Sequence, residues 1–206
     1  MKSYYFKLDH SMLAYALLQR SALRRLDLTF CEIVEYDMAL MRPWLPEMAH
    51  KILDVGSGIA AIDVRLNQRY PDAEFYLLDK TAMADTKYGA QTKQEFYTSQ
   101  TVAQRLLSWG GIDLDRVHTL EATPDYAVGA SEFNLVISLF SWGWHYPVGA
   151  YAEAVGRATV PGGILITDVR NWEGEDVLLD YFKELTKLEL LEGYRCVYER
   201  RRREGE

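Results

Sequence analysis

A glycine-rich turn is the first place where this sequence could do chemistry. Residues 51–55 form a short apolar run, and Gly56, Ser57 and Gly58 follow it directly. Glycines here permit a tight turn and let the backbone approach a ligand closely. The helix expected next points backbone N–H groups and a partial positive charge at the same place. The segment predicts a site for a carboxylate or a phosphate, although a strand-to-helix turn without any ligand fits the same pattern.

An acidic residue follows the glycine turn at an informative distance. Asp79 ends the next apolar run, about 20 residues further on, where a carboxylate can accept hydrogen bonds from ribose hydroxyls. Together the two features indicate a cofactor that contains a nucleoside. They suit a nicotinamide dinucleotide and S-adenosylmethionine equally well.

An aromatic cluster with one histidine is the third candidate. Ser141, Trp142, Trp144, His145 and Tyr146 follow a later apolar run. The unperturbed pKa of histidine, about 6.5, makes His145 a possible general base at neutral pH. The other four residues are expected to line a flat or apolar substrate face, sugars included. Two alternatives stay open: His145 only hydrogen-bonds the loop, and one of the tryptophans belongs to the core.

Apolar runs that alternate with helical patterns must position these residues. The expected strands span 51–55, 74–78, 117–121, 133–139 and 163–169, and the expected helices between them span 60–69, 99–109 and 148–159. A helix over 176–187 and a hairpin of 188–191 and 194–201, turning at Glu192-Gly193, end the chain, and helices near 15–26 and 34–41 begin it. This order predicts a doubly wound α/β fold: a mostly parallel seven-stranded sheet, a C-terminal antiparallel hairpin and an N-terminal helical appendage.

Several of these features together resemble one enzyme family. Because Asp54 stands two residues before Gly56, the segment 53–58 resembles motif I of class I S-adenosylmethionine-dependent methyltransferases. Residues 160–163, Val-Pro-Gly-Gly, resemble the turn before strand five of that family, and the terminal hairpin is typical of it. The resemblance covers roughly residues 51–201 and favours S-adenosylmethionine over a nicotinamide cofactor.

The resemblance implies a map of the cofactor site. The implied contacts of the methionyl part are the backbone of Gly56, Ser57 and Gly58, with Asp54 behind them. The implied contacts of the nucleoside are Asp79 at the ribose, Lys80 beside the adenine, and Ala122 and Thr123 at the adenine edge. Near the sulfonium, the pocket is expected to be closed by Ser138 and Leu139. Asp54 could equally be a buried acid bonded to the turn, without ligand contact.

The same resemblance implies methyl transfer to a small molecule, with S-adenosylhomocysteine as the product. We expect a sugar-like or phenolic hydroxyl as acceptor, because the aromatic loop loosely resembles that of sugar O-methyltransferases. Residues 49–206 would form the S-adenosylmethionine-binding methyltransferase domain, and residues 1–48 a helical cap on the substrate side. The long connection 80–97 is expected to act as a lid. The alternatives are an N-methyltransferase acting on an amine, protein or RNA, a non-catalytic S-adenosylmethionine-binding module, and a dehydrogenase.

We expect no metal in this site. Asp168 and Asn171 follow the fifth strand as in some metal-dependent O-methyltransferases, but the fourth strand supplies Ser138 and Ser141 rather than an acid. Oxygen-ligated metals need several oxygen ligands that converge. Asp168 is therefore expected to be a loop or capping residue.

Composition restricts the partners and the location. The 206 residues carry a formal net charge of −7 and two cysteines, which argues against a nucleic-acid partner and a disulfide framework. The basic run 200–203 is expected to be the solvated end of the last strand. The apolar stretch 11–18 is too short for a membrane span and is flanked unlike an export signal. We expect a soluble, cytoplasmic protein, and the sequence leaves its oligomeric state open.

Overall fold

The computed structural model of the chain describes residues 28–80, 100–129 and 132–202. The helix expected near 15–26 and nearly all of the lid expected at 80–97 lie outside these residues.

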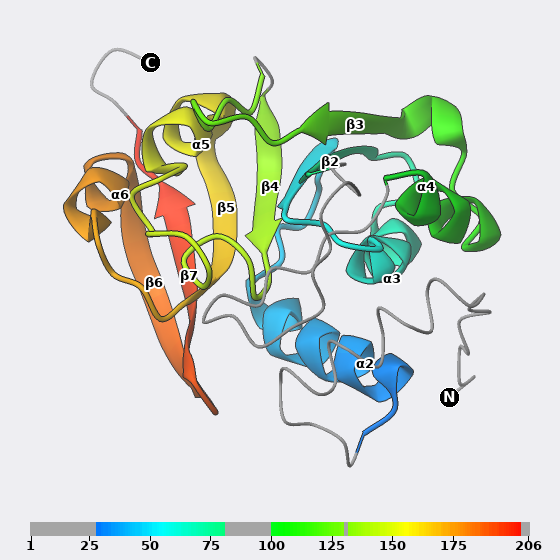
Figure 1. The fold of residues 1–206 in the computed structure, drawn as a ribbon, viewed down its shortest axis with the longest axis horizontal. Helices are drawn as coiled ribbons and strands as arrows, with labels where there is room; N and C mark the ends of the chain where they lie inside the picture. Colours follow the sequence, from blue (N-terminus) through cyan, green and yellow to red (C-terminus); the bar gives the residue numbers. More distant parts are fainter. Residues whose placement is uncertain (1–27, 81–99, 130–131, 203–206) are drawn as a thin grey trace.

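A seven-stranded sheet forms the centre of the molecule (Figure 1). Its strands are β1 (Lys51–Val55), β2 (Glu74–Asp79), β3 (Val117–Glu121), β4 (Phe133–Ser138), β5 (Thr159–Val169), β6 (Phe182–Leu190) and β7 (Gly193–Arg200). They lie in the order β3-β2-β1-β4-β5-β7-β6, and β7 runs antiparallel to both of its neighbours. The pairs from β3 through to β5 are all parallel. The predicted fold class is therefore confirmed.

Helices cover both faces of the sheet. One face carries α2 (Phe30–Met41), α3 (Ala61–Arg69) and α4 (Gln100–Trp109), and the other carries α5 (Ala152–Ala158) and α6 (Glu175–Tyr181). Two 3-10 turns, Arg42–Trp44 and Leu114–Arg116, follow α2 and precede β3. A capping box starts α2: the Thr29 side chain accepts from the Glu32 backbone N–H, and the Glu32 carboxylate accepts from the Thr29 N–H at 2.7 Å. This satisfies two backbone donors that a helix start leaves free.

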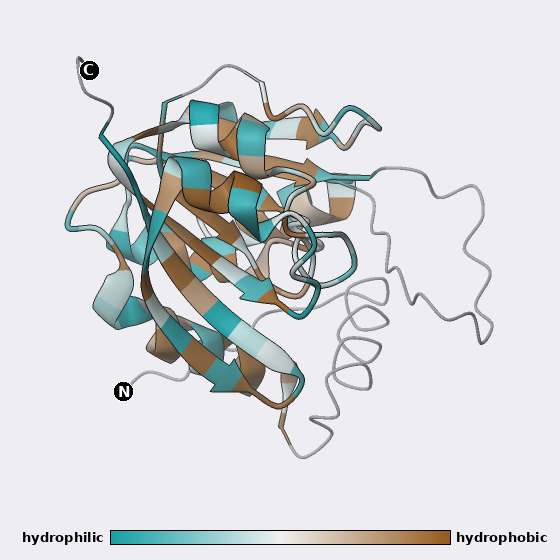
Figure 2. Ribbon diagram, turned by 90° about the vertical axis from the view of Figure 1, so that its left-hand side faces the viewer, coloured by the Kyte–Doolittle hydropathy of each residue, from teal (hydrophilic) through white to brown (hydrophobic). Residues whose placement is uncertain are grey.

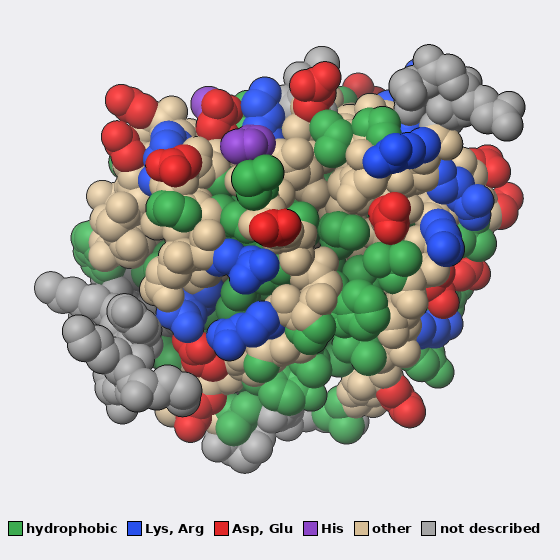
Figure 3. Space-filling view, turned by 180° about the vertical axis from the view of Figure 1, so that it is seen from behind, with side chains coloured by type: hydrophobic (Ala, Val, Ile, Leu, Met, Phe, Trp, Pro, Cys, Tyr) green, Lys and Arg blue, Asp and Glu red, His purple; other side chains and the backbone are tan. Residues whose placement is uncertain are grey.

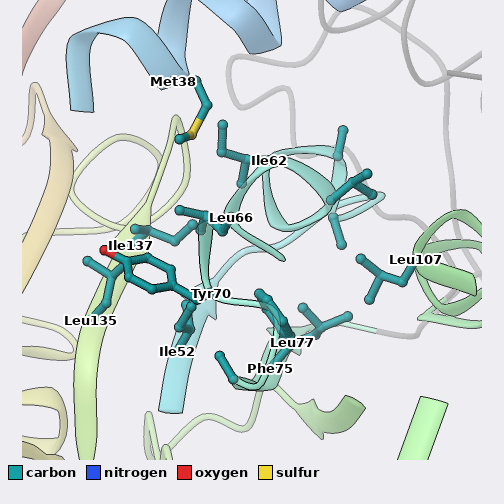
Figure 4. Close-up of a cluster of buried hydrophobic side chains, with 14 of the residues drawn as sticks. Met38, Ile52, Ile62, Leu66, Tyr70, Phe75, Leu77, Leu107, Leu135 and Ile137 are labelled. Atoms are coloured by element: carbon teal, nitrogen blue, oxygen red, sulfur yellow. The ribbon is translucent and has the colours of Figure 1, made fainter. Parts of the chain in front are cut away.

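Alternation along the strands divides the core into two layers. Ile52 contributes to the cluster under α2, α3 and α4, whereas its neighbour Leu53 contributes to the cluster under α5 and α6. Figure 4 shows side chains of three helices, among them Met38, Ile62 and Leu107, meeting the first of these faces. The hairpin of β6 and β7 mixes hydrophilic and hydrophobic residues (Figure 2). Successive side chains of a strand point to opposite faces, so central strands buried on both faces are mostly apolar.

The C-terminal elements differ from the prediction in their limits. The helix expected over 176–187 ends at Tyr181, and residues 182–190 form β6. Leu, Glu and Lys favour helix in this stretch, but pairing with β7 completes the sheet and outweighs the local preference. The turn of the hairpin lies at residues 191–192, one position before the expected one. The helix expected at 148–159 is the shorter α5.

Candidate functional site

The strand order reverses between β1 and β4, and this is where an open α/β sheet forms its ligand crevice. The chain leaves β1 for α3 on one face and leaves β4 for α5 on the other. At the carboxyl ends of the two strands, the Ser138 hydroxyl donates to the Val55 carbonyl at 2.8 Å and accepts from the Trp142 N–H at 2.9 Å. Ser138 is fully buried. Its side chain therefore joins the two strands at the crevice rather than pointing into it.

The glycine turn forms one wall of this crevice. Gly56 has φ +78°, and a Cβ atom there would lie 1.8 Å from the Oγ atom of Ser141. Only glycine fits, because both the backbone conformation and the available space exclude a side chain. The loop after β4 thus packs directly on the turn after β1, which brings predicted cofactor and substrate residues together.

Asp79 lies against the same turn, as the sequence spacing suggested. Its Oδ2 atom accepts from the Gly58 N–H at 2.7 Å, and its Oδ1 atom accepts from the Lys80 N–H at 2.7 Å. Burial raises the pKa of Asp79 to about 6, although these two hydrogen bonds oppose the shift. Each carboxylate oxygen has a further lone pair for a ligand hydroxyl.

The predicted adenine-edge residues follow β3 beside Asp79. The Ala122 N–H donates to the Asp79 carbonyl at 3.1 Å. The hydroxyl of Thr123 is exposed and donates to Asp125. Lys80 is also exposed. These residues lie at the same edge of the sheet as the glycine turn.

A cavity of about 50 Å³ lies between α2 and the glycine turn. Its polar lining includes Asp54 and Ser57, and Leu139 closes it from the end of β4. The Ser57 Oγ atom is buried and has no hydrogen-bond partner among the described residues. A buried hydroxyl without a partner costs stability. The cavity therefore presents a polar atom that a ligand could satisfy. Its α2 wall consists of Phe30, Ile33, Val34 and Asp37.

Two buried acids that sequence reasoning missed stand close to this cavity. Asp63, in the first turn of α3, is fully buried and contacts Asp54. Burial and the neighbouring carboxyls of Asp63 and Asp79 raise the pKa of Asp54 well above its ordinary value, and burial raises the pKa of Asp63 to about 7. Asp37, from α2, is the second missed acid and lines the cavity itself.

A buried arginine holds Asp37 in place. The guanidinium of Arg195, on β7, forms two hydrogen bonds to the Asp168 carboxylate, at 2.7 and 2.9 Å, and one ion pair with Asp37 at 2.9 Å. Arg195 and Asp168 are both fully buried. The expectation that Asp168 is a loop or capping residue was wrong: it anchors an ion pair that ties α2 to the sheet.

The aromatic loop divides into buried and partly accessible residues. Trp142 is fully buried, and its Nε1 atom donates to the Val148 carbonyl at 2.8 Å. It therefore belongs to the core, which corrects its assignment to the substrate face. Trp144 is 8% exposed, and the Arg170 guanidinium lies 4.8 Å from its ring centre. Ser141 and Tyr146 are half-buried.

His145 is half-buried, and its backbone N–H donates to the Ser141 carbonyl at 2.8 Å. Burial, assisted by the positive charge of Arg170, lowers its pKa to about 4. This is well below the ordinary histidine value of about 6.5. The imidazole is therefore neutral throughout the physiological pH range.

Metal, membrane and basic-surface features are limited in the described residues. No group of three or more His, Cys, Asp or Glu in residues 28–80, 100–129 and 132–202 is arranged to hold a metal ion. No helix among them is long and apolar enough to cross a membrane. Arg200 is not solvated as expected: it is buried, and its guanidinium donates to the Gly156 carbonyl. On the face seen in Figure 3, basic side chains are interspersed with acidic ones.

This fold, with the crevice at the carboxyl ends of β1 and β4, is that of class I S-adenosylmethionine-dependent methyltransferases. No protein-family model matches the sequence, and no curated protein matches it either.

Solved structures with a similar fold share little sequence with this chain. The "O-MT" segment of StiE, residues 961–1257, has a TM-score of 0.62 at 11% identity, over 89% of this chain and 81% of that one. N,N-8-amino-8-demethyl-D-riboflavin dimethyltransferase (RosA) from Streptomyces davawensis has a TM-score of 0.60 at 13% identity, over 91% of this chain and 62% of RosA. The pyocyanin biosynthetic protein PhzM has a TM-score of 0.58 at 16% identity, over 91% and 61%. The chain thus spans less than two thirds of RosA and of PhzM.

Proposed function

We propose that this chain binds S-adenosylmethionine and transfers its methyl group to a small-molecule hydroxyl, sugar-like or phenolic. One observation carries the proposal. The glycine turn, the Asp79 carboxylate and a cavity with an unpartnered Ser57 hydroxyl meet at the point where the strand order reverses. This combination of groups suits a nucleoside linked to a small polar tail.

The residues present fit the proposed cofactor. The methionyl tail would occupy the cavity between α2 and the turn, where Asp54 offers charge to its ammonium group and Ser57 offers an unused hydroxyl. Asp79 would hold the ribose through its free lone pairs, and Lys80, Ala122 and Thr123 would border the adenine. When bound, the cofactor supplies an electrophilic methyl group on a sulfonium. Leu139 lines the cavity from the strand that leads to the substrate loop.

The acceptor would lie against the loop after β4. Ser141 contacts the glycine turn, and His145 and Tyr146 follow it as partly accessible side chains. We propose His145 as the general base, because its neutral imidazole can take the hydroxyl proton as the new O–CH₃ bond forms. Trp144 would add an apolar edge beneath Arg170. Residues 1–48 are proposed as a cap, in which α2 forms one wall of the cofactor cavity.

The acceptor type distinguishes the proposal from its rivals. RosA is named as a dimethyltransferase of an amino-riboflavin and the StiE segment as an O-MT, so the fold is found with both kinds of acceptor. A general base at His145 would serve a hydroxyl acceptor, since an amine substrate that is already deprotonated needs no base before it attacks.

A labelled-methyl assay tests this function directly. The chain is incubated with methyl-labelled S-adenosylmethionine and panels of sugars, phenols, amines and RNA. Label is expected in a sugar or phenol fraction and not in RNA. Label confined to amines would overturn the hydroxyl assignment. Binding of the cofactor without transfer to any acceptor would favour a non-catalytic binding module.

A further inference from the structure

Two buried carboxyl groups contact each other next to the cofactor cavity. Asp54, at the end of β1, is 4% exposed, and Asp63, in the first turn of α3, is 0% exposed. Among the described residues, no amine, guanidinium or hydroxyl hydrogen-bonds to either carboxylate oxygen of Asp63. Its neighbours are the Asp54 carboxyl and its own backbone N–H. Two carboxyl groups can hydrogen-bond to each other only when one of them keeps a proton.

The pair has access to a ligand through Asp54. Asp54 lines the cavity under α2, and so does the 8%-exposed Ser57, whose Oγ atom has no partner in the described part of the chain. The cavity thus combines one member of a carboxyl pair with an unsatisfied hydroxyl. A ligand tail with a cationic donor group can pair with the Asp54 carboxylate and donate a hydrogen bond to the Ser57 hydroxyl.

The charges around the Asp54–Asp63 pair favour the binding of a cation. The charged groups that raise the pKa of Asp54 are both carboxyls, Asp63 from α3 and Asp79 from β2. Asp37 of α2 lines the same cavity and is bound by Arg195, which is shared with the buried Asp168. The guanidinium charge of Arg195 is therefore already matched by two carboxylates.

We infer that Asp54 and Asp63 share one proton in the ligand-free protein and release it to solvent when the ammonium group of the methionyl tail enters the cavity. The inference rests on the proposed function, and it makes Asp63 a positioning residue that acts through Asp54. Removing the ammonium restores the proton to the pair. Cofactor affinity then rises with pH, because the protonated pair must give up its proton before it can face a cation with full charge.

Calorimetry of the unaltered chain tests this without any substitution. S-adenosylhomocysteine, which carries the same methionyl tail, is titrated at pH 6, 7 and 8 in buffers of different ionisation enthalpy. Because burial raises the pKa of Asp63 to about 7, we expect proton release on binding that is largest at pH 6 and declines toward pH 8. The affinity should rise about tenfold from pH 6 to pH 8. Binding without proton release would overturn the inference and leave the proposed function standing, whereas no binding at any pH would overturn both.

The Asp63→Asn variant separates the pair from other titrating groups. The amide keeps the shape of Asp63 and donates a hydrogen bond to Asp54, as the shared proton does, but it has nothing to release. Its affinity for S-adenosylhomocysteine should change less than about threefold between pH 6 and 8. Asp79 and the ligand amine titrate in both proteins, so they cancel in the comparison. Asp72→Asn, at an exposed position before β2, should retain the full tenfold change. Equal pH dependence in the Asp63→Asn variant and the unaltered chain would contradict the inference.

Discussion

At the residue scale, Asp79 is the acid that its spacing from the glycine turn predicts as a partner of the ribose. Its carboxylate accepts hydrogen bonds from the Gly58 and Lys80 N–H groups at 2.7 Å each, and each oxygen keeps a lone pair that a ribose hydroxyl could use. Asp79→Asn should weaken binding of S-adenosylhomocysteine by about 1.5–3 kcal/mol, which is tenfold or more, because a hydrogen bond to a charged group is lost. Titration calorimetry measures this, with Asp72→Asn as the exposed control. Unchanged affinity in a folded Asp79→Asn protein would exclude Asp79 from the site.

His145 provides a second prediction at this scale. If its neutral imidazole takes the hydroxyl proton, His145→Gln should lower turnover by about 10²–10⁴-fold while cofactor binding is retained. The lowered pKa, about 4, places the acid limb of the unaltered enzyme near that pH and leaves the rate flat from pH 6 to 8. The measurement is a pH–rate profile with one identified acceptor. Equal rates for the two proteins, or an acid limb in both, would show that His145 is not the base.

The site residues that could be predicted from the sequence are fixed by local geometry, whereas those that could not be predicted depend on tertiary contacts. Gly56 and Asp79 were predictable because the backbone geometry of a turn requires glycine and because strand length sets the spacing to the acid. Asp37 and Asp63 stand within apolar patterns, and this could have indicated them, because charged residues are rarely buried unless they are paired. Their partners, Arg195 and Asp54, could not be predicted, because these contacts arise only when the sheet assembles. The burial of Trp142 likewise depends on how the loop packs.

At the element scale, α2 lines the candidate site within the part of the N-terminal region that the structure describes, residues 28–48. It is held by a buried ion pair between Asp37 and Arg195 and by an exposed one between Glu35 and Arg65 on α3. Asp37→Asn should destabilise the docking of α2 by about 1.5–3 kcal/mol. Glu35→Gln should cost about 0–1 kcal/mol, since exposed ion pairs contribute little.

Hydrogen exchange resolved by element measures both variants. Faster exchange confined to α2 is expected for Asp37→Asn, with β5 and β7 unaffected, because Arg195 keeps its two hydrogen bonds to Asp168. Equal exchange rates of α2 in the two variants would contradict a clamping role for Arg195.

The elements themselves were largely predictable. Central strands such as β4 are apolar at almost every position because both of their faces are covered, and this pattern is visible in the sequence. The limits of α6 and β6 could not be predicted, because residues 182–187 consist largely of good helix formers. They join the sheet only through pairing with β7. Local preference and tertiary pairing conflict there, and pairing determines the structure.

At the scale of the whole molecule, the buried acids set a pH dependence of stability. The pKa values of Asp54 and Asp63 are raised by burial, whereas in the unfolded chain an aspartate releases its proton near pH 4. Between about pH 4 and 7 the folded state therefore binds more protons than the unfolded state, so the free energy of unfolding falls as pH rises through this window. Urea unfolding at pH 5 and pH 8 should show a smaller fall for Asp63→Asn than for the unaltered chain. An equal fall in both would mean that Asp63 is ionised in the folded protein across this range.

The central claim is that the crevice between β1 and β4, lined by α2, holds S-adenosylmethionine. Parallel calorimetric titrations of the full chain with S-adenosylhomocysteine and with NAD⁺ test it most directly, since the glycine turn and Asp79 by themselves suit either cofactor. We expect one-to-one binding of S-adenosylhomocysteine, weakened in the Asp79→Asn protein, and no heat of binding with NAD⁺. Binding of NAD⁺ in the absence of any binding of S-adenosylhomocysteine would contradict it.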